Sequence, residues 1–272
     1  LYDVKVILLD TPTLAPQPQR TPYVAPAPLS TEARWYAGDF HVHSRESGDA
    51  QPPLDEIITF AKTQGLDFAL ITDHNTVSQL DFYGAAQQAH PDFLLLPGME
   101  FTTYAGHAHA IGSTAWADHK VDLPGNSIDQ SAQAFRDQGA LFSINHPTLD
   151  LGDLCIGCAW TQDIDPELID AVEIQTGNVL KLNAIIGDSA IDYWDDLLDQ
   201  GRHVAAIGGS DDHRAGEQLT FFQSPIGDPT TLVFASELSV QGIIDGVKSG
   251  RTGVKLDGPN SPMFMVTSGV AP

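Results

Sequence analysis

The stretch Gly-Asp-Phe-His-Val-His, residues 38–43, holds the pattern on which the predicted fold rests. It ends a predicted β-strand and places His41 and His43 two positions apart. Residues two apart on a strand point to the same face, so both imidazoles can reach one metal ion. We therefore expect this strand to deliver two metal ligands at its C-terminal end.

Outside this stretch, short apolar runs alternate with segments of helical periodicity. The run Phe-Ala-Leu-Ile at 68–71 is typical of a buried parallel strand, and comparable runs occur at 93–96, 140–144, 171–174 and 204–207. Helices are predicted from Leu54 to a stop at Gly65 and around 78–89, 129–138, 188–200 and 237–249. Strands that alternate with helices indicate a parallel sheet covered by helices.

Side chains that can bind metal follow the predicted strands. Besides the first pair they are Asp73 and His74, Glu100, His107 and His109, His146, and Asp211 and His213. Seven of the ten histidines lie at these positions, which makes chance placement a poor explanation. Parallel strands of a barrel bring their C-terminal ends to one rim, so we expect these side chains to meet there.

Nitrogen and carboxylate donors without thiolate suit zinc, manganese or iron. The candidate ligands are more numerous than one tetrahedral ion needs. The sequence therefore predicts a bridged cluster of divalent cations.

Five short motifs occur in a specific order along the chain. They are H-x-H at 41–43, T-D-H-N at 72–75, G-M-E at 98–100, N-H-P at 145–147 and G-S-D-D-H at 209–213. Together they resemble the PHP (polymerase and histidinol phosphatase) superfamily of metal-dependent hydrolases, over about residues 38–257. The stretches 250–254 and 100–107 resemble its carbaryl hydrolase-like branch. The resemblance implies a distorted (β/α)7 TIM-like barrel with two or three ions at the C-terminal rim of the strands.

The resemblance also implies a set of ligands. One ion would be held by His41, His43, Glu100 and Asp211. A second would be held by Glu100, His146 and either His107 or His109. A third would be held by Asp49, His74 and His213. The family often has Ser-Asp-Gly after the first H-x-H, whereas this chain has Ser-Arg-Glu-Ser-Gly-Asp at 44–49. Between the two alternatives in the second H-x-H, we favour His107.

The implied activity is hydrolysis of phosphoesters through a metal-bridging hydroxide. Asp211 or an unligated histidine would pass protons to the leaving group. Arg214 would meet the charge of the substrate, and Asp73 would orient its neighbour His74. Further cationic candidates are Arg45, Lys181 and Arg251. A carboxylic or carbamic ester is the alternative substrate, and a non-catalytic metal-binding module is the alternative from another class.

The chain is strongly acidic, with 13 Lys and Arg against 36 Asp and Glu and a formal net charge of −23. Such a surface repels nucleic acid and anionic membranes, and no apolar run is long enough for a membrane span. We expect a small-molecule substrate and no nucleic-acid partner. The oligomeric state is left open.

The two ends of the chain and its cysteines complete the prediction. Residues 1–35 are expected to form a strand at 1–10 and a proline-rich arm, and 36–272 the hydrolase barrel with a C-terminal extension. Cys155 and Cys158 form a single C-x-x-C pair, which is only half of a zinc knuckle. We favour a local disulfide, with a reduced pair or a redox pair as alternatives. The cysteine pair and the arm favour a secreted or periplasmic location over the cytoplasm.

Overall fold

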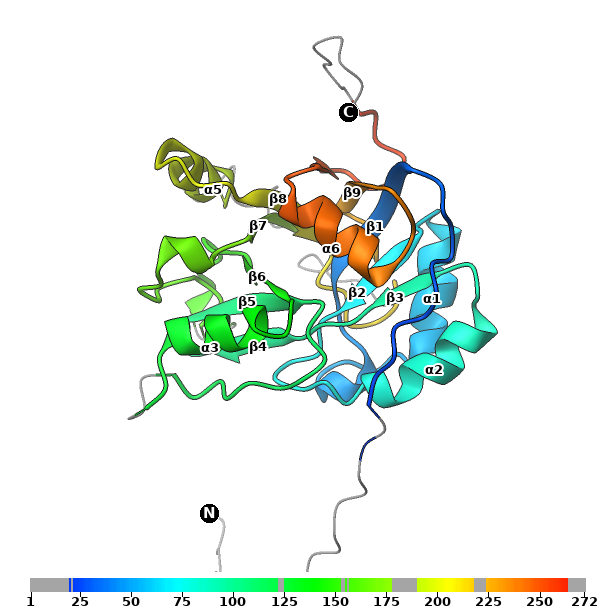
Figure 1. The fold of residues 1–272 in the computed structure, drawn as a ribbon, viewed down its shortest axis with the longest axis horizontal. Helices are drawn as coiled ribbons and strands as arrows, with labels where there is room; N and C mark the ends of the chain where they lie inside the picture. Colours follow the sequence, from blue (N-terminus) through cyan, green and yellow to red (C-terminus); the bar gives the residue numbers. More distant parts are fainter. Residues whose placement is uncertain are drawn as a thin grey trace, which may run out of the picture.

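The computed structural model describes residues 20, 22–121, 125–152, 155, 157–177, 190–217 and 224–263. In this part of the chain, ten β-strands form two five-stranded sheets (Figure 1). Five α-helices pack against the sheets: α1 (Leu54–Thr63), α2 (Leu80–Ala89), α3 (Ile128–Arg136), α5 (Ala190–Asp199) and α6 (Val240–Lys248). None of the helices in these ranges combines the length and the apolar composition that a membrane crossing requires.

The first sheet has the strand order β10-β9-β1-β2-β3. Its strands are β1 (Arg34–Val42), β2 (Phe68–Ile71), β3 (Leu94–Leu96), β9 (Thr230–Ala235) and β10 (Thr252–Lys255). β1, β2 and β3 are parallel, whereas β9 pairs antiparallel with both β1 and β10.

The second sheet has the order β4-β5-β6-β7-β8. It contains β4 (Glu100–Thr103), β5 (Gly106–Ile111), β6 (Leu141–Ile144), β7 (Ala171–Thr176) and β8 (Ala205–Gly209). β5 is antiparallel to both β4 and β6, and only β6, β7 and β8 are parallel to one another.

The predicted (β/α)7 TIM-like barrel is therefore wrong. The described residues form two mixed sheets and no closed barrel, with five α-helices instead of seven. The physical reason lies in the short connection between β4 and β5, which contains only Tyr104 and Ala105. A connection this short joins antiparallel strands, whereas parallel neighbours need a crossover of a dozen residues or more.

Backbone hydrogen bonds join the two sheets where β1 and β2 end. The amide of His43 donates to the carbonyl of Asp212 at 3.0 Å, and that of Asp211 donates to the carbonyl of His41 at 2.8 Å. Beside β2, the amide of Asn75 donates to the carbonyl of Glu100 at 2.9 Å. The loops that carry the predicted ligands therefore cross from one sheet to the other.

Most helices and buried strands follow the sequence periodicity. In α1 the residues Leu54, Ile57, Ile58 and Ala61 are buried as their helical spacing predicts. In β2, Phe68 and Leu70 belong to one apolar cluster, and Ala69 and Ile71 to another. β2 is thus buried on both faces, as parallel strands generally are.

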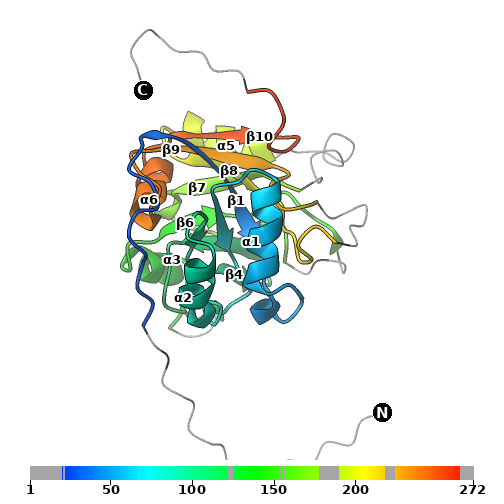
Figure 2. The same ribbon diagram turned by 90° about the vertical axis from the view of Figure 1, so that its right-hand side faces the viewer.

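The described part of the N-terminal arm has no helix or strand before Ser30, which forms an isolated bridge with Leu238. It runs past α6 towards α2 (Figure 2), where Tyr23 packs edge-on against Tyr83 at 5.8 Å. The division into an N-terminal arm and a hydrolase domain remains a prediction. The strand predicted at 1–10 lies outside the described residues.

Candidate metal centre

The predicted ligands lie close together although they come from both sheets. His41 and His43 end β1, Asp49 follows in the next loop, His74 follows β2, Glu100 opens β4, His107 and His109 lie within β5, His146 follows β6, and Asp211 and His213 follow β8. Glu100, His107 and His109 are thus not at C-terminal strand ends, because β4 and β5 form an antiparallel hairpin. In that hairpin Glu100 stands directly opposite His109.

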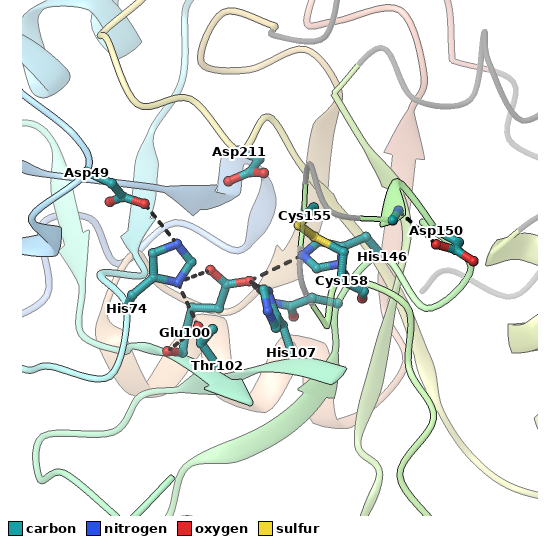
Figure 3. Close-up of a disulfide and its surroundings, with 12 residues drawn as sticks. Asp49, His74, Glu100, Thr102, His107, His146, Asp150, Cys155, Cys158 and Asp211 are labelled. Carbon is teal, nitrogen blue, oxygen red and sulfur yellow. Dashed lines mark hydrogen bonds and ion pairs between the residues drawn. A yellow bond between two sulfur atoms is a disulfide. The ribbon is translucent and has the colours of Figure 1, made fainter. Parts of the chain in front are cut away.

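Glu100 occupies the centre of the cluster, and its side chain is only 1% exposed. Its Oε1 lies 3.2 Å from His107 Nδ1 and 3.3 Å from His146 Nε2. Its Oε2 lies 2.9 Å from His74 Nδ1 and 3.4 Å from His41 Nε2 (Figure 3). The two oxygens of one carboxylate therefore face different histidines, as a bridging ligand requires.

Asp211 closes the cluster on the side of β8. Its Oδ1 lies 3.2 Å from His41 Nε2 and 3.1 Å from His43 Nε2. Asp211 has φ of 57° and His146 has φ of 28°, both in the left-handed region that non-glycine residues seldom adopt. Strained backbone of this kind concentrates at functional sites.

Asp49, His74 and His213 form a more exposed group. Asp49 Oδ2 lies 3.2 Å from His74 Nε2 and 3.4 Å from His213 Nε2. The ring of His213 stacks on that of His43 with 4.1 Å between centroids. The structure therefore brings Asp49 to the two histidines with which it was grouped from the sequence.

His107 and His109 occupy different parts of the cluster. His107 lies beside Glu100 and His146, whereas a ring nitrogen of His109 lies within 4.8 Å of donor atoms of His41 and Glu173. The ring centroids of His109 and His41 are 4.3 Å apart. The position of His107 is the one expected of a ligand shared with Glu100.

The donor atoms fit divalent cations. His41 Nε2, His43 Nε2 and Glu100 Oε2 are buried and lie at ion-pair distance from one another or from Asp211 and His74, but they form no well-oriented hydrogen bond among the described residues, and neither does His107 Nε2. Buried polar atoms are nearly always satisfied, so converging lone pairs without donors indicate a missing cationic partner. Histidine nitrogens and carboxylate oxygens are ligands for zinc, manganese and iron.

Charge pairing holds the cluster together electrostatically. Burial would raise the pKa of Glu100, but His41, His74 and His107 outweigh it and hold that pKa well below its usual range. Burial would lower the pKa of His41, but the carboxylates of Glu173, Asp211 and Glu100 outweigh it and raise that pKa. The buried carboxylate of Glu100 thus depends on positive charge around it, which bound cations would also supply.

The histidines nearest Asp49 differ from His43. The carboxylates of Glu100 and Asp49 overcome burial and raise the pKa of His74 to about 10. The bond to Asp49 and the charge of Asp211 likewise overcome burial and raise the pKa of His213 to about 9. Burial and the neighbouring His213 lower the pKa of His43 to about 3. His43 therefore presents an unprotonated nitrogen.

Glu173 is a residue of the cluster that the sequence prediction missed. It lies in β7, is fully buried, and its Oε1 is 2.9 Å from His41 Nδ1. Its Oε2 accepts the backbone N–H of His146 at 3.1 Å. A carboxylate on the far nitrogen of a ligating histidine fixes the ring orientation and tautomer. The signal was present in the sequence, as a charged residue inside the apolar strand Ala-Val-Glu-Ile-Gln-Thr.

Asp39 was also missed, although it lies two residues before His41 on the same strand face. Its Oδ1 accepts the backbone N–H groups of His41 at 2.9 Å and Ser210 at 3.0 Å. Its Oδ2 accepts the N–H of Gly227 at 2.7 Å. Asp39 thus holds the end of β1 against the loop that carries Asp211.

Asp73 and Arg214 were predicted to act in catalysis. The carboxylate of Asp73 accepts the backbone N–H and the hydroxyl of Ser44, both at 2.6 Å, and so anchors the loop after His43. Arg214 follows His213 in a half-buried position, and its backbone N–H donates to Asp212. Their catalytic roles remain predictions.

The other cationic side chains that were predicted to meet the substrate are Arg45, Arg251 and Lys181. The guanidinium of Arg45 lies 5.5 Å from the centroid of the Phe82 ring, and that of Arg251 lies 5.3 Å from the centroid of the Phe234 ring. Lys181 lies outside the described residues. Arg214 is thus the described candidate that adjoins a ligand in sequence.

The predicted disulfide between Cys155 and Cys158 is present. It lies next to His146, as Figure 3 shows, on the side of the cluster away from Asp49. The Nδ1 of His146 donates to the carbonyl of Cys158 at 3.0 Å, because a carbonyl can only accept. Because Nδ1 makes this bond, the Nε2 of His146 is available to contact Glu100 or to bind a cation.

Fold and site together define an α/β protein with clusters of histidines and carboxylates suited to divalent metals. Residues 39–151 match the model of the PHP domain, a stretch that contains the candidate ligands from His41 to His146. This match supports the class predicted from the sequence, a metal-dependent hydrolase. A comparison with curated proteins found no match.

Two solved structures share the fold. One is a two-domain protein from Bacteroides vulgatus described as containing a predicted PHP-like metal-dependent phosphoesterase, with 23% identity, a TM-score of 0.60, and coverage of 89% of this chain and 70% of that one. The other is PsfC from Pseudomonas syringae, with 15% identity, a TM-score of 0.52, and coverage of 81% and 91%. Neither comparison distinguishes the carbaryl hydrolase-like branch.

Proposed function

We propose that this protein hydrolyses phosphoesters at a centre of two or three divalent cations, with zinc, manganese or iron as the metal. The observation that carries the proposal is the position of Glu100, whose two oxygens face different histidines from both sheets. The PHP domain match supports the hydrolase class. The description of the Bacteroides vulgatus protein as containing a predicted phosphoesterase agrees with the proposed substrate.

The ligands divide into three sets. One cation would be held by His41, His43, Glu100 and Asp211. A second would be held by Glu100, His107 and His146. A third would be held by Asp49, His74 and His213. When bound, the cations would lower the pKa of a shared water and polarise the group that is cleaved. The carboxylate of Glu173 would keep the ring of His41 and the backbone of His146 in place.

Asp211 and Arg214 are the residues proposed to act on the substrate. The side chain of Asp211 is 34% exposed, so its carboxylate can reach a leaving group and pass a proton to it. Arg214 follows the ligand His213, and its guanidinium would pair with the phosphoryl oxygens of a substrate.

An uncharged carboxylic or carbamic ester is the second candidate substrate. It is favoured by the positions of Arg45 and Arg251, whose guanidinium groups lie over the rings of Phe82 and Phe234. A phosphoester needs cationic partners for its oxygens, whereas a neutral ester does not. Arg214 therefore separates the two candidates.

The test begins with the metal content of the purified protein by mass spectrometry of the elements. Chelated and metal-restored protein is then assayed on a panel of phosphate monoesters, phosphate diesters and neutral esters. We expect metal-dependent turnover to be highest with a phosphoester. Turnover confined to neutral esters would favour the second candidate, and full activity after chelation would contradict both.

A further inference from the structure

The segment that contains the disulfide is fixed against the metal centre. The carbonyl of Cys158 accepts from His146, and the amide of Trp160 donates to the carbonyl of Pro147 at 2.8 Å. On its other side, the amide of Thr161 donates to the carbonyl of Ala105 in the turn between β4 and β5 at 2.7 Å. Residues 157–161 are thus held between the loop after β6 and the hairpin that carries His107.

The two sulfurs of the disulfide are in different environments. Cys158 is 4% exposed, and its sulfur and ring nitrogens of His107 and His146 all lie within 4.8 Å of one another. Cys155 is only partly buried. His107 is itself 5% exposed, and its Nε2 has no hydrogen-bond partner among the described residues. A buried sulfur therefore adjoins two histidines that the second cation would use.

We propose that Cys158 is a redox-controlled ligand of the cation held by Glu100, His107 and His146. The disulfide withholds its sulfur from the cation, and reduction supplies a thiolate as an additional ligand. This inference rests on the metal centre of the proposed function and adds a means of regulating it.

The difference in exposure between the two sulfurs determines which of them a reductant attacks first. A thiolate of a dithiol reductant attacks the sulfur of Cys155, the bond between the two cysteine sulfurs breaks, and its electron pair leaves with Cys158 as a thiolate. The second thiol of the reductant then attacks the mixed disulfide and releases Cys155. The reductant ends as a disulfide and gives up two electrons and two protons, one to the thiol of Cys155 and one to solvent. Cys158 remains a thiolate on the cation, which is the form that binds metal.

The added ligand changes what the second cation can do. Catalytic zinc sites keep one coordination position open, whereas structural sites fill all positions with protein ligands. With the disulfide intact, that position stays available to substrate. After reduction, the thiolate of Cys158 competes for it. We expect the reduced protein to bind the cation at least about 10-fold more tightly, which is the smallest effect that changes around metal ligands usually have.

Cobalt(II) provides a direct readout, because a bond between cobalt and thiolate has a charge-transfer absorption in the near ultraviolet that nitrogen and oxygen ligands lack. Full-length protein is loaded with cobalt in its oxidised form, and again after reduction with a phosphine that is removed by desalting. The matched variants are Cys155→Ser and Cys158→Ser. Both abolish the disulfide, but only Cys155→Ser leaves a sulfur at position 158.

We expect no sulfur band in the oxidised protein, a band in the reduced protein, and the same band in Cys155→Ser without any reductant. Cys158→Ser should bind cobalt without the band. Cobalt bound without a band in both reduced protein and Cys155→Ser would overturn this inference alone, and so would equal bands in the two variants. If the variants do not fold, reduction of the wild-type protein decides the question. Oxidised protein that binds no cobalt would overturn the metal centre as well.

Discussion

The cluster has a buried half and an exposed half, and Glu100 joins them. In the buried half, the side chains of His41, His146 and His107 are 0%, 3% and 6% exposed. In the exposed half, those of His213, His74 and Asp49 are 19%, 27% and 49% exposed. Solvent therefore reaches Asp49, His74 and His213 more readily than the buried histidines.

The two halves differ in how their ligands are supported. His41 and His146 both contact the buried carboxylate of Glu173, and His146 also donates to Cys158. Asp49 comes from a loop after the short 3₁₀-helix Arg45–Ser47. Supported, buried ligands are suited to a permanent cation, whereas loop ligands open to solvent are suited to a cation that exchanges.

The largest effect is expected from Glu100→Ala, which removes the connection between the halves. Two cations would lose a ligand, and their mutual repulsion would be less compensated. We expect kcat/KM to fall by at least about 100-fold, similar to the loss of a strong electrostatic group in other active sites. Metal content should fall in the same variant. Glu56→Ala, on the exposed side of α1, is the matched control. Wild-type turnover and metal content in Glu100→Ala would contradict a bridging role.

Arg214→Ala tests whether the substrate enters beside the exposed half. A charge-assisted hydrogen bond to a phosphoryl oxygen contributes about 1.5–3 kcal/mol, which corresponds to a loss of roughly 10- to 150-fold in kcat/KM. Free phosphate should also inhibit the variant less than the parent. On a neutral ester the same change should matter only a few-fold. Unimpaired phosphoesterase activity would remove Arg214 from the mechanism.

Glu173→Gln tests the support of the buried half. Replacing the carboxylate keeps the shape but removes the charge that faces His41, and changes of this kind usually reduce metal affinity or activity by about 10- to 100-fold. The measurement is the metal dissociation constant by competition with a chelator. Glu167→Gln is the control, since the side chain of Glu167 is 70% exposed. An unchanged dissociation constant would assign Glu173 a purely structural role.

The smallest effect is expected from Asp49→Asn in the exposed half. The variant loses the charge that pairs with His74 and His213, so it should bind one cation fewer. Turnover should fall by no more than about 10-fold, the low end for changes around metal ligands. Metal analysis and steady-state kinetics on the same sample measure both quantities. A loss as large as that of Glu100→Ala would mean that the two halves act as one unit.

The same contrast shows what could be predicted from the sequence. α1 and β2 were predictable because their periodicity is local, and His74, His146 and His213 were recognised because each follows a buried strand. Glu173 and Asp39 were not recognised because their partners are remote. Glu173 Oε1 meets a residue 132 positions away, and Asp39 meets Ser210, 171 positions away.

The barrel prediction failed for a related reason. In the hairpin of β4 and β5, the residues His-Ala-His-Ala-Ile are all buried. The segment therefore lacks the alternation of buried and exposed residues by which antiparallel strands are often recognised. The positions of β9 and β10 in the sheet depend on the pairing of β9 with β1 and of β10 with β9. Pairing over such distances has no counterpart in local periodicity.

The origin of the ligands in two separate sheets has a consequence for folding. A cation bound by His41 and Asp211, or by His74 and Glu100, ties one sheet to the other, as the backbone bonds at the same place do. The unfolded chain cannot present these donors together, so the free energy of unfolding should rise with the concentration of free metal. At 100 times the dissociation constant, mass action adds about 2.7 kcal/mol for each site. The melting temperature of this protein is thus a property of its surroundings as much as of its sequence.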